Sequence, residues 1–266
     1  MPLLTQVARA AAIVPAARAP PRRTFAAASL QAGGEGTAPG AEAAAAAELE
    51  RAFQRSDFAA LRVVGQFNLG FILAVLNDDL FIIDQHASDE IYNFERLRRT
   101  TVLNKQPLIA PVPLDLSPAE EQALAHHADT FRANGFDFDA APGDDDQAPR
   151  TRLTAVPFSK NTTFGPADVQ ELLALLEGGA APVPSQAAAV RAGPFGSLED
   201  GVVRPSRVRA MLAMRACRCS IMIGRALDTQ QMERVLQHLS ELRAPWNCPH
   251  GRPTMRHLAD LRLAAL

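Results

Sequence analysis

The fold of this chain is decided at residues 80–95, which read LFIIDQHASDEIYNFE. The apolar run at 80–83 predicts a buried strand, and the polar residues after it predict a helix that begins near Ser88. Asp84 and His86 therefore lie where a strand ends and a helix is about to begin. Because a carboxylate and an imidazole stand together at this junction, it is the first candidate for a functional site.

Two segments further along the chain add side chains of the same chemical kind. One contains Cys217, and the other contains Cys248 and His250. Together with His86 and Glu90 they provide imidazole, thiolate and carboxylate groups, the ligands that zinc and similar divalent ions prefer. The candidates come from three distant segments, unlike the closely spaced cysteine pairs of a zinc finger, so we expect the tertiary fold to assemble the site.

These three segments, in this order, resemble the C-terminal endonuclease domain of the MutL family of DNA mismatch-repair proteins, specifically the eukaryotic Pms-type subunit. The family's signature is Asp-Gln-His-Ala, two residues, Glu, four residues and Glu, and residues 84–95 fit it without a gap. The other motifs of the family appear as ACR at 216–218 and CPHGRP at 248–253. With QFNLGFI at 66–72 and RPSRV at 204–208, the resemblance covers about residues 58–266.

The resemblance implies a metal-dependent endonuclease that nicks one strand of duplex DNA during mismatch repair. The metal ligands it implies are His86, Glu90, Cys217, Cys248 and His250. Asp84 is implied as an acidic residue needed for cleavage, Glu90 as catalytic and able to bridge two ions, and Glu95 as support for the motif. The ions expected are Zn²⁺, Mn²⁺ or both, with one or two bound.

The resemblance also implies protein partners. Residues 106–111, QPLIAP, resemble the family's sliding-clamp-binding motif, and prolines keep such a peptide extended. The residues expected to bind the clamp are Gln106, Leu108, Ile109 and Pro111. A Pms-type chain is further expected to pair with an Mlh-type MutL subunit, to bind double-stranded DNA and to act indirectly with a MutS-type mismatch-recognition complex. No membrane partner is expected, because no apolar run reaches about 18 residues.

The expected fold class is α+β, a MutL C-terminal-like dimerisation subdomain with an inserted external, regulatory subdomain. We expect residues 1–57 to be disordered, 58–115 and 205–266 to form the dimerisation and endonuclease subdomain, and 116–204 to form the insertion. In the first part of the chain we expect a hairpin of 71–76 and 80–83 and a helix that is capped by Ser117 and ends near 134–135. Strands near 136–138 and 151–157, a helix at 168–177 and a mobile stretch at 180–199 should follow. The last expected helix is capped by Asp228 and Gln231, and its apolar stripe at 232–242 is expected to be buried.

Composition limits how the chain meets DNA. The net charge of −2 gives no general attraction to a polyanion, so binding depends on local arginines. Six arginines lie between 204 and 225, and Arg207, Arg209 and Arg218 are the expected phosphate contacts. Three cysteines, two of them in the ligand set, point to a reducing compartment and not to a disulfide framework. The family implies the nucleus, whereas an acid-free, arginine-containing stretch at 1–34 is also compatible with an organelle.

One alternative function stays open. The same Cys and His side chains also suit a non-catalytic, zinc-stabilised module that binds an Mlh-type partner and a sliding clamp. Against it stand Asp84 and Glu90, since structural zinc sites favour closed sets of Cys and His. Nothing in the chain resembles the ATPase domain with which MutL proteins begin, so we expect no ATP site here and a short form or a part of a MutL protein.

Overall fold

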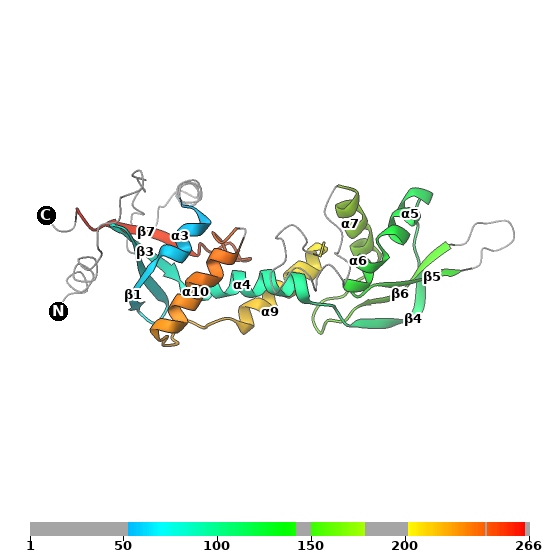
Figure 1. Ribbon diagram of the computed structural model, residues 1–266. Coiled ribbons are helices and arrows are strands. Elements are labelled where there is room, and N and C mark those ends of the chain that lie inside the picture. Colours follow the sequence, from blue (N-terminus) through cyan, green and yellow to red (C-terminus); the bar gives the residue numbers. More distant parts are fainter. Residues whose placement is uncertain (1–52, 142–149, 179–201, 243, 264–266) are drawn as a thin grey trace, which may run out of the picture. The chain divides into compact units, whose positions relative to one another are not determined.

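The computed structural model describes residues 53–141, 150–178, 202–242 and 244–263 (Figure 1). The chain divides into two compact units. The first unit combines residues up to Asn93 with those from Cys217 onward, and the second runs from Phe94 to Ala216. The predicted mobile stretch at 180–199 and the predicted disorder of residues 1–52 lie outside the described residues.

The first unit is built on an antiparallel sheet with the strand order β1-β2-β3-β7. Its strands are β1 (Arg62–Phe67), β2 (Phe71–Leu76), β3 (Asp79–Asp84) and β7 (Met255–Asp260). The predicted hairpin of β2 and β3 is confirmed, and Asn77 in its turn has φ 55°. Asparagine tolerates this left-handed conformation, which a tight two-residue hairpin turn requires.

One face of the sheet packs against aromatic side chains. Phe53 is 2% exposed, and its ring lies 4.9 Å from that of Phe58, 5.3 Å from that of Phe81 and 6.1 Å from that of Trp246. The expected disorder of residues 1–57 is therefore wrong for Phe53, which packs in the core. Helix α3 (Arg55–Ala60) is too short to show an aliphatic period in the sequence, and two phenylalanines anchor it instead.

The opposite face of the same sheet is also apolar. Leu73, Val75 and Leu80 form a buried cluster. Half-buried side chains pack around it, namely Val64, Ile82, Leu258 and Leu261. An antiparallel sheet usually exposes polar residues on one face, so apolar residues on both faces indicate that both must be covered.

Helix α10 (Thr229–Glu241) packs against α3 and β1. Oδ1 of Asp228 accepts the backbone N–H of Gln231, and Oε1 of Gln231 accepts the backbone N–H of Asp228, which confirms the predicted cap. The predicted stripe is buried, as shown by Met232, Val235, Leu236, Leu239 and Leu242.

Helix α4 (Gln85–Thr100) begins three residues before the predicted start at Ser88. Oδ1 of Asp84 accepts the backbone N–H groups of His86 and Ala87, both at 2.9 Å, so Asp84 is the residue that caps the helix. β3 pairs with β2 up to Asp84, and the chain therefore passes from strand to helix without a loop. The second long helix, α9 (Ser206–Cys219), brings Cys217 toward the site.

The second unit contains an antiparallel sheet with the order β4-β6-β5, the helices α5, α6 and α7, and most of α9. Its elements are β4 (Lys105–Pro113), α5 (Pro118–His126), α6 (Ala128–Ala133), β5 (Asp137–Ala141), β6 (Arg150–Pro157) and α7 (Pro166–Glu177). The cap at Ser117 is confirmed, although the helix divides at His127 into α5 and α6. α6 ends at Ala133, and Gly135 follows the C-cap Asn134 with a φ of +82°, which favours glycine.

The boundaries of this unit differ from the expected insertion at 116–204. β4 pairs with β6, so residues from the end of α4 onward already belong to the second unit. Most of α9 belongs to it as well, since the division falls between Ala216 and Cys217. The predicted insertion is shorter than the observed unit at both ends, because cross-strand pairing between distant segments leaves no local signal in the sequence.

Arg204 is a structural residue of the second unit and not part of a basic surface. Its side chain is buried and donates to the carbonyl oxygens of Arg98, Thr101 and Ala133, and to Oδ1 of Asn134. Burial, with a smaller contribution from the charge of Arg98, lowers the pKa of Arg204 to about 10. The side chain of Arg204 thus joins the end of α4 to the end of α6. Because it is buried, Arg204 does not belong to the arginine cluster predicted at the surface.

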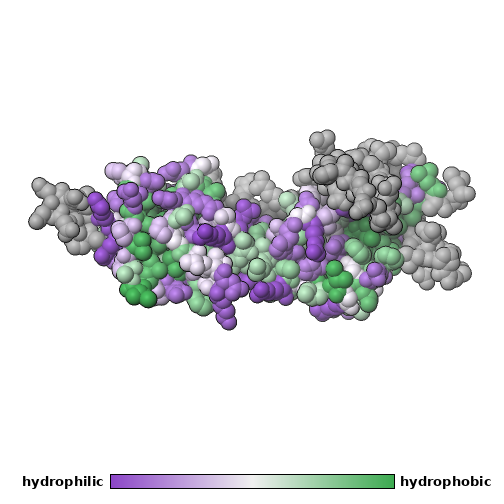
Figure 2. Space-filling view, turned by 180° about the vertical axis from the view of Figure 1, so that it is seen from behind, coloured by the Kyte–Doolittle hydropathy of each residue, from purple (hydrophilic) through white to green (hydrophobic). Residues whose placement is uncertain are grey.

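The surface of the described residues is mixed in character. In the view of Figure 2, hydrophobic side chains reach the surface among hydrophilic ones. The large exposed apolar side chains include Leu69, Val102, Ile109, Met222 and Ile223. No helix in the described part of the chain is both long enough and apolar enough to cross a membrane.

Candidate metal centre

The five predicted ligands gather in the first unit as two groups that share one residue. One group is His86, Glu90 and Cys217, and the other is Glu90, Cys248 and His250. Within each group the potential ligand atoms all lie within 4.8 Å of one another. α4 supplies His86 and Glu90 one helical turn apart, α9 supplies Cys217 at its end, and the loop before β7 supplies the other two.

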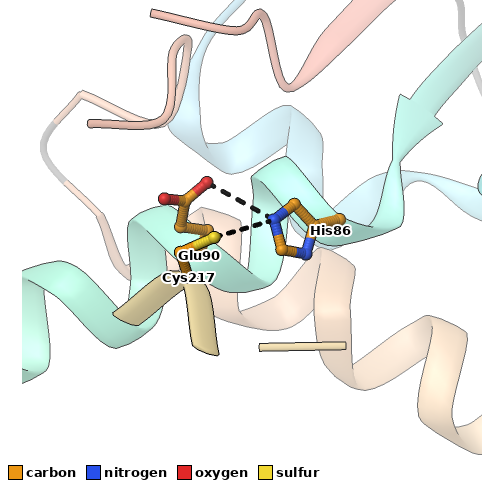
Figure 3. Close-up of side chains that lie close together, drawn as sticks. All are labelled: His86, Glu90 and Cys217. Atoms are coloured by element: carbon orange, nitrogen blue, oxygen red, sulfur yellow. Dashed lines mark hydrogen bonds and ion pairs between the residues drawn. The ribbon is translucent and has the colours of Figure 1, made fainter. Parts of the chain in front are cut away.

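The first group has the spacing of a tetrahedral site. Nε2 of His86 lies 3.6 Å from Sγ of Cys217 and 3.7 Å from Oε2 of Glu90 (Figure 3). Two ligands of a tetrahedral zinc ion, with bonds of about 2.0–2.3 Å, stand roughly 3.3–3.8 Å apart. The donor atoms and their spacing therefore fit a divalent ion with little movement.

The imidazole of His86 is held in the orientation that such a site needs. Its Nδ1 lies 2.9 Å from the carbonyl oxygen of Ile221. A carbonyl oxygen can only accept, so Nδ1 carries the proton and, in the neutral ring, Nε2 has a free lone pair. That lone pair belongs to the nitrogen nearest Cys217 and Glu90, as Figure 3 shows.

In the second group, the side chains of His250 and Glu90 contact each other directly. Nδ1 of His250 lies 2.5 Å from Oε1 of Glu90, a hydrogen bond and not the spacing of two ligands on one ion. His250 is 47% exposed at its side chain whereas Glu90 is 1% exposed, so the histidine is the partner that is free to move. Burial raises the pKa of the Cys248 thiol, and the nearby Glu90 carboxylate adds to the rise.

A tight turn positions Cys248 and His250. The backbone N–H of Cys248 donates to the Arg252 carbonyl at 2.8 Å, and that of Gly251 donates to the Cys248 carbonyl at 2.9 Å. Gly251 has φ +83°, a conformation that a side chain would strain. The turn explains why the sequence places a glycine directly after His250.

The remaining motif acids lie outside both groups. Asp84 caps α4 through Oδ1, as described above. The carboxylate of Glu95 lies 3.5 Å from the guanidinium of Arg98 and 3.5 Å from that of Arg99. The structure therefore gives each of these two acids a contact that stabilises α4.

The predicted clamp-binding segment lies on β4, in extended backbone as expected. The register of the pairing between β4 and β6 shifts between Pro107 and Val112, which marks a β-bulge or irregularity in the strand. Leu108 is half-buried and Ile109 is fully exposed, at 108% of its reference area. Gln106 and Pro111 are exposed as well.

The expected phosphate contacts are all at the surface. Arg207 is exposed but already donates to the Thr163 carbonyl at 3.0 Å and lies 3.5 Å from Asp168. Arg209 and Arg218 are exposed on α9.

Comparison with known proteins identifies the class. Residues 64–192 match the family described as the MutL C terminal dimerisation domain. The chain thus belongs to the MutL family, with the mixed helices and sheets of that α+β domain. Its relatives of high identity include eukaryotic PMS1 and PMS2 proteins.

It is 50% identical over 249 residues to "DNA mismatch repair protein PMS1" of Arabidopsis thaliana, covering 91% of this chain and 26% of that protein. It is 48% identical over 227 residues to "Mismatch repair endonuclease PMS2" of Homo sapiens, covering 84% of this chain and 24% of that protein. It is 44% identical over 212 residues to "DNA mismatch repair protein PMS1" of Saccharomyces cerevisiae, covering 78% and 22%. The chain therefore spans about a quarter of the length of these relatives.

Proposed function

We propose that this chain is the catalytic part of a metal-dependent endonuclease that nicks one strand of duplex DNA in nuclear mismatch repair. The observation that supports the proposal is the meeting of two ligand groups at Glu90. The printed names of the human, chicken and mouse relatives, each a mismatch repair endonuclease, point the same way.

The residues would hold one or two ions around Glu90. His86 and Cys217 would hold one, and Cys248 and His250 the other, with a carboxylate oxygen of Glu90 offered to each. Thiolate and imidazole favour Zn²⁺, whereas a carboxylate also suits Mn²⁺. A bound divalent ion supplies an activated water and stabilises charge on the leaving oxygen.

The protein's own side chains prepare the site for that chemistry. The side chain of Glu90 is 1% exposed, and its two oxygens lie 3.7 Å from Nε2 of His86 and 2.5 Å from Nδ1 of His250. The Ile221 carbonyl holds His86 in the tautomer that offers Nε2. Arg209 and Arg218 are the exposed cations on α9 that we propose as phosphate contacts.

The direct test is nicking of supercoiled plasmid with Mn²⁺ by the Glu90→Gln variant. Glutamine keeps the shape of glutamate but removes the charge shared by both groups. We expect nicking to fall on the order of 100-fold or more, as when a preorganised electrostatic group is removed. Glu233→Gln, which alters an exposed glutamate of α10, is the matched control and should nick normally. Equal nicking by the two variants would refute the proposal.

The dimerisation partner is proposed to be an Mlh-type MutL subunit. The apolar face formed by Leu73, Val75 and Leu80 with half-buried neighbours suits a subunit interface, since such a face needs cover. Ile82→Asp should weaken binding to the Mlh-type subunit at least tenfold by sedimentation, while Val102→Asp at an exposed site should not. Chemical denaturation of each variant alone checks that the fold survives.

A sliding clamp is the second proposed protein partner. The register between β4 and β6 shifts between Pro107 and Val112, and Ile109 within this stretch is fully exposed, so its side chain is accessible to a partner. Replacing Gln106 and Leu108 by Ala should remove stimulation of nicking by a loaded clamp but preserve basal nicking. Val102→Ala, at another exposed apolar site, should leave the stimulation intact.

A non-catalytic zinc module is the competing function, because both groups combine a thiolate with an imidazole. It predicts tight zinc binding and partner binding without nicking under any metal.

On the endonuclease proposal a MutS-type mismatch-recognition complex acts upstream, and its effect on nicking requires the DNA mismatch and not a direct contact with this chain.

A further inference from the structure

We propose that Asp89 and Asn93 are positioning residues of the metal centre, which fix the backbone at Ser220 and Ile221 and through it the imidazole of His86. The inference rests on the proposed metal centre. It assigns a role to two polar residues of α4 that lie outside both ligand groups.

The contacts form a closed set behind the site. Oδ2 of Asp89 accepts the backbone N–H of Ile221 at 2.9 Å and Nδ2 of Asn93 at 3.1 Å. Nδ2 of Asn93 also donates to Oγ of Ser220 at 3.0 Å. Asn93 and Ser220 are both buried, so these hydrogen bonds are shielded from competing water.

Ile221 links this set to the ligand. Its N–H is held by Asp89 and its carbonyl oxygen lies 2.9 Å from Nδ1 of His86. His86 and Asp89 are three residues apart on α4, and Asp89 and Asn93 are four apart, so all three side chains share one face of the helix. Ile221 of the facing loop is therefore hydrogen-bonded through both its backbone N–H and its carbonyl oxygen to side chains on one face of α4.

A second anchor holds the same loop on its far side. Nε2 of Gln85 donates to the carbonyl oxygens of Leu69, at 3.0 Å, and Met222, at 3.2 Å. Nε2 of Gln66 donates to Oε1 of Gln85 at 2.6 Å. Because Gln85 is fully buried, its hydrogen bond to the carbonyl oxygen of Met222 is shielded from competing water. The segment between Ser220 and Met222 is thus fixed from both directions.

The geometry explains how the loop controls metal binding. If Ile221 moves, Nδ1 of His86 loses its acceptor and the ring is free to rotate or to change tautomer, so Nε2 no longer points at Cys217 and Glu90. Partners that orient a ligating histidine typically change metal affinity about 10- to 100-fold when they are removed. Asp89 and Asn93 act one step further out, through Ile221.

The test uses the whole chain and a Co²⁺ titration, since the absorption of cobalt reports both affinity and the Cys217 thiolate bond. Asp89→Ala removes both acceptor contacts and should weaken Co²⁺ binding about tenfold or more and reduce the part of the sulfur-to-cobalt band that comes from Cys217, which a Cys248→Ser background isolates from the second group. Asp89→Asn keeps an oxygen able to accept from Ile221 and should bind within about threefold of the original protein. Asp129→Ala, which truncates an exposed aspartate of α6, is the matched control.

Rescue by asparagine separates positioning from general stability. Thermal unfolding without metal measures the stability of each variant, and a loss of affinity in variants that remain folded supports the proposal. Unchanged affinity and an unchanged band in folded Asp89→Ala overturn it. Should Asp89→Ala not fold, Asn93→Ala decides, because it keeps the Asp89 contact to Ile221: weakening of threefold or more supports the inference and no change refutes it.

The reference protein distinguishes this inference from the proposed function. If the original chain binds cobalt with a thiolate band but Asp89→Ala is identical to it, only the positioning role fails. If the original chain binds cobalt and the variants behave as expected but no DNA is nicked, only the endonuclease proposal fails. If the original chain binds no cobalt, the metal centre itself is refuted.

Discussion

Asp84 offers the sharpest separation of a structural from a catalytic role. In the structure its Oδ1 accepts two backbone N–H groups at the start of α4. Asparagine is as good a capping residue as aspartate, whereas alanine cannot cap, and loss of a cap costs about 1–2 kcal/mol. For a unit of this size, each kcal/mol of destabilisation lowers Tm by roughly 4–8 °C.

The two substitutions therefore make different predictions. Asp84→Ala should lower Tm and abolish nicking, while Asp84→Asn should keep Tm within about 2 °C but still lose nicking by on the order of 100-fold, because the charge needed for cleavage is gone. Tm comes from scanning calorimetry and nicking from conversion of supercoiled plasmid with Mn²⁺. If Asp84→Asn nicks within threefold of the original chain, Asp84 only caps the helix and its proposed catalytic role is refuted.

Three further predictions follow from contacts described above. Arg204→Met should destabilise the second unit by about 3 kcal/mol in urea unfolding, since several buried carbonyl groups lose their donor, and an unchanged midpoint would contradict the role assigned to the guanidinium. Zn²⁺ affinity should rise with pH between 6 and 8, because metal binding must displace a proton from the Cys248 thiol, whose pKa burial raises; a pH-independent competition titration would contradict this. His86→Ala should weaken the first equivalent of Co²⁺ more than His250→Ala does, because only the first group already has ligand spacing, and equal losses would contradict that ranking.

The sequence predicted much of the local structure because local signals are strong. The hairpin of β2 and β3, the caps at Ser117 and Asp228 and the buried stripe of α10 each depend on neighbouring residues, and each is confirmed. The start of α4 was misplaced because Ser88 and Asp84 are both good caps. The choice is made by β3, which stays paired with β2 as far as Asp84.

Other features depend on contacts between distant segments, which no local pattern reveals. The burial of Arg204 requires that the ends of α4 and α6 meet. His257 is buried and lies 2.8 Å from Asp79 because β7 pairs with β3. Asp89 and Gln85 were adjacent to predicted site residues, but their roles appear only once the loop after α9 is known to lie against α4.

Sharing Glu90 between two ligand groups has a thermodynamic consequence. In the proposed metal centre the two oxygens of this buried carboxylate cannot respond independently, so an ion bound in one group would alter the affinity of the other group, and reciprocity requires the same factor in both directions. Such binding sites form a coupled pair, and their titration follows two macroscopic constants that belong to the pair rather than to either side alone.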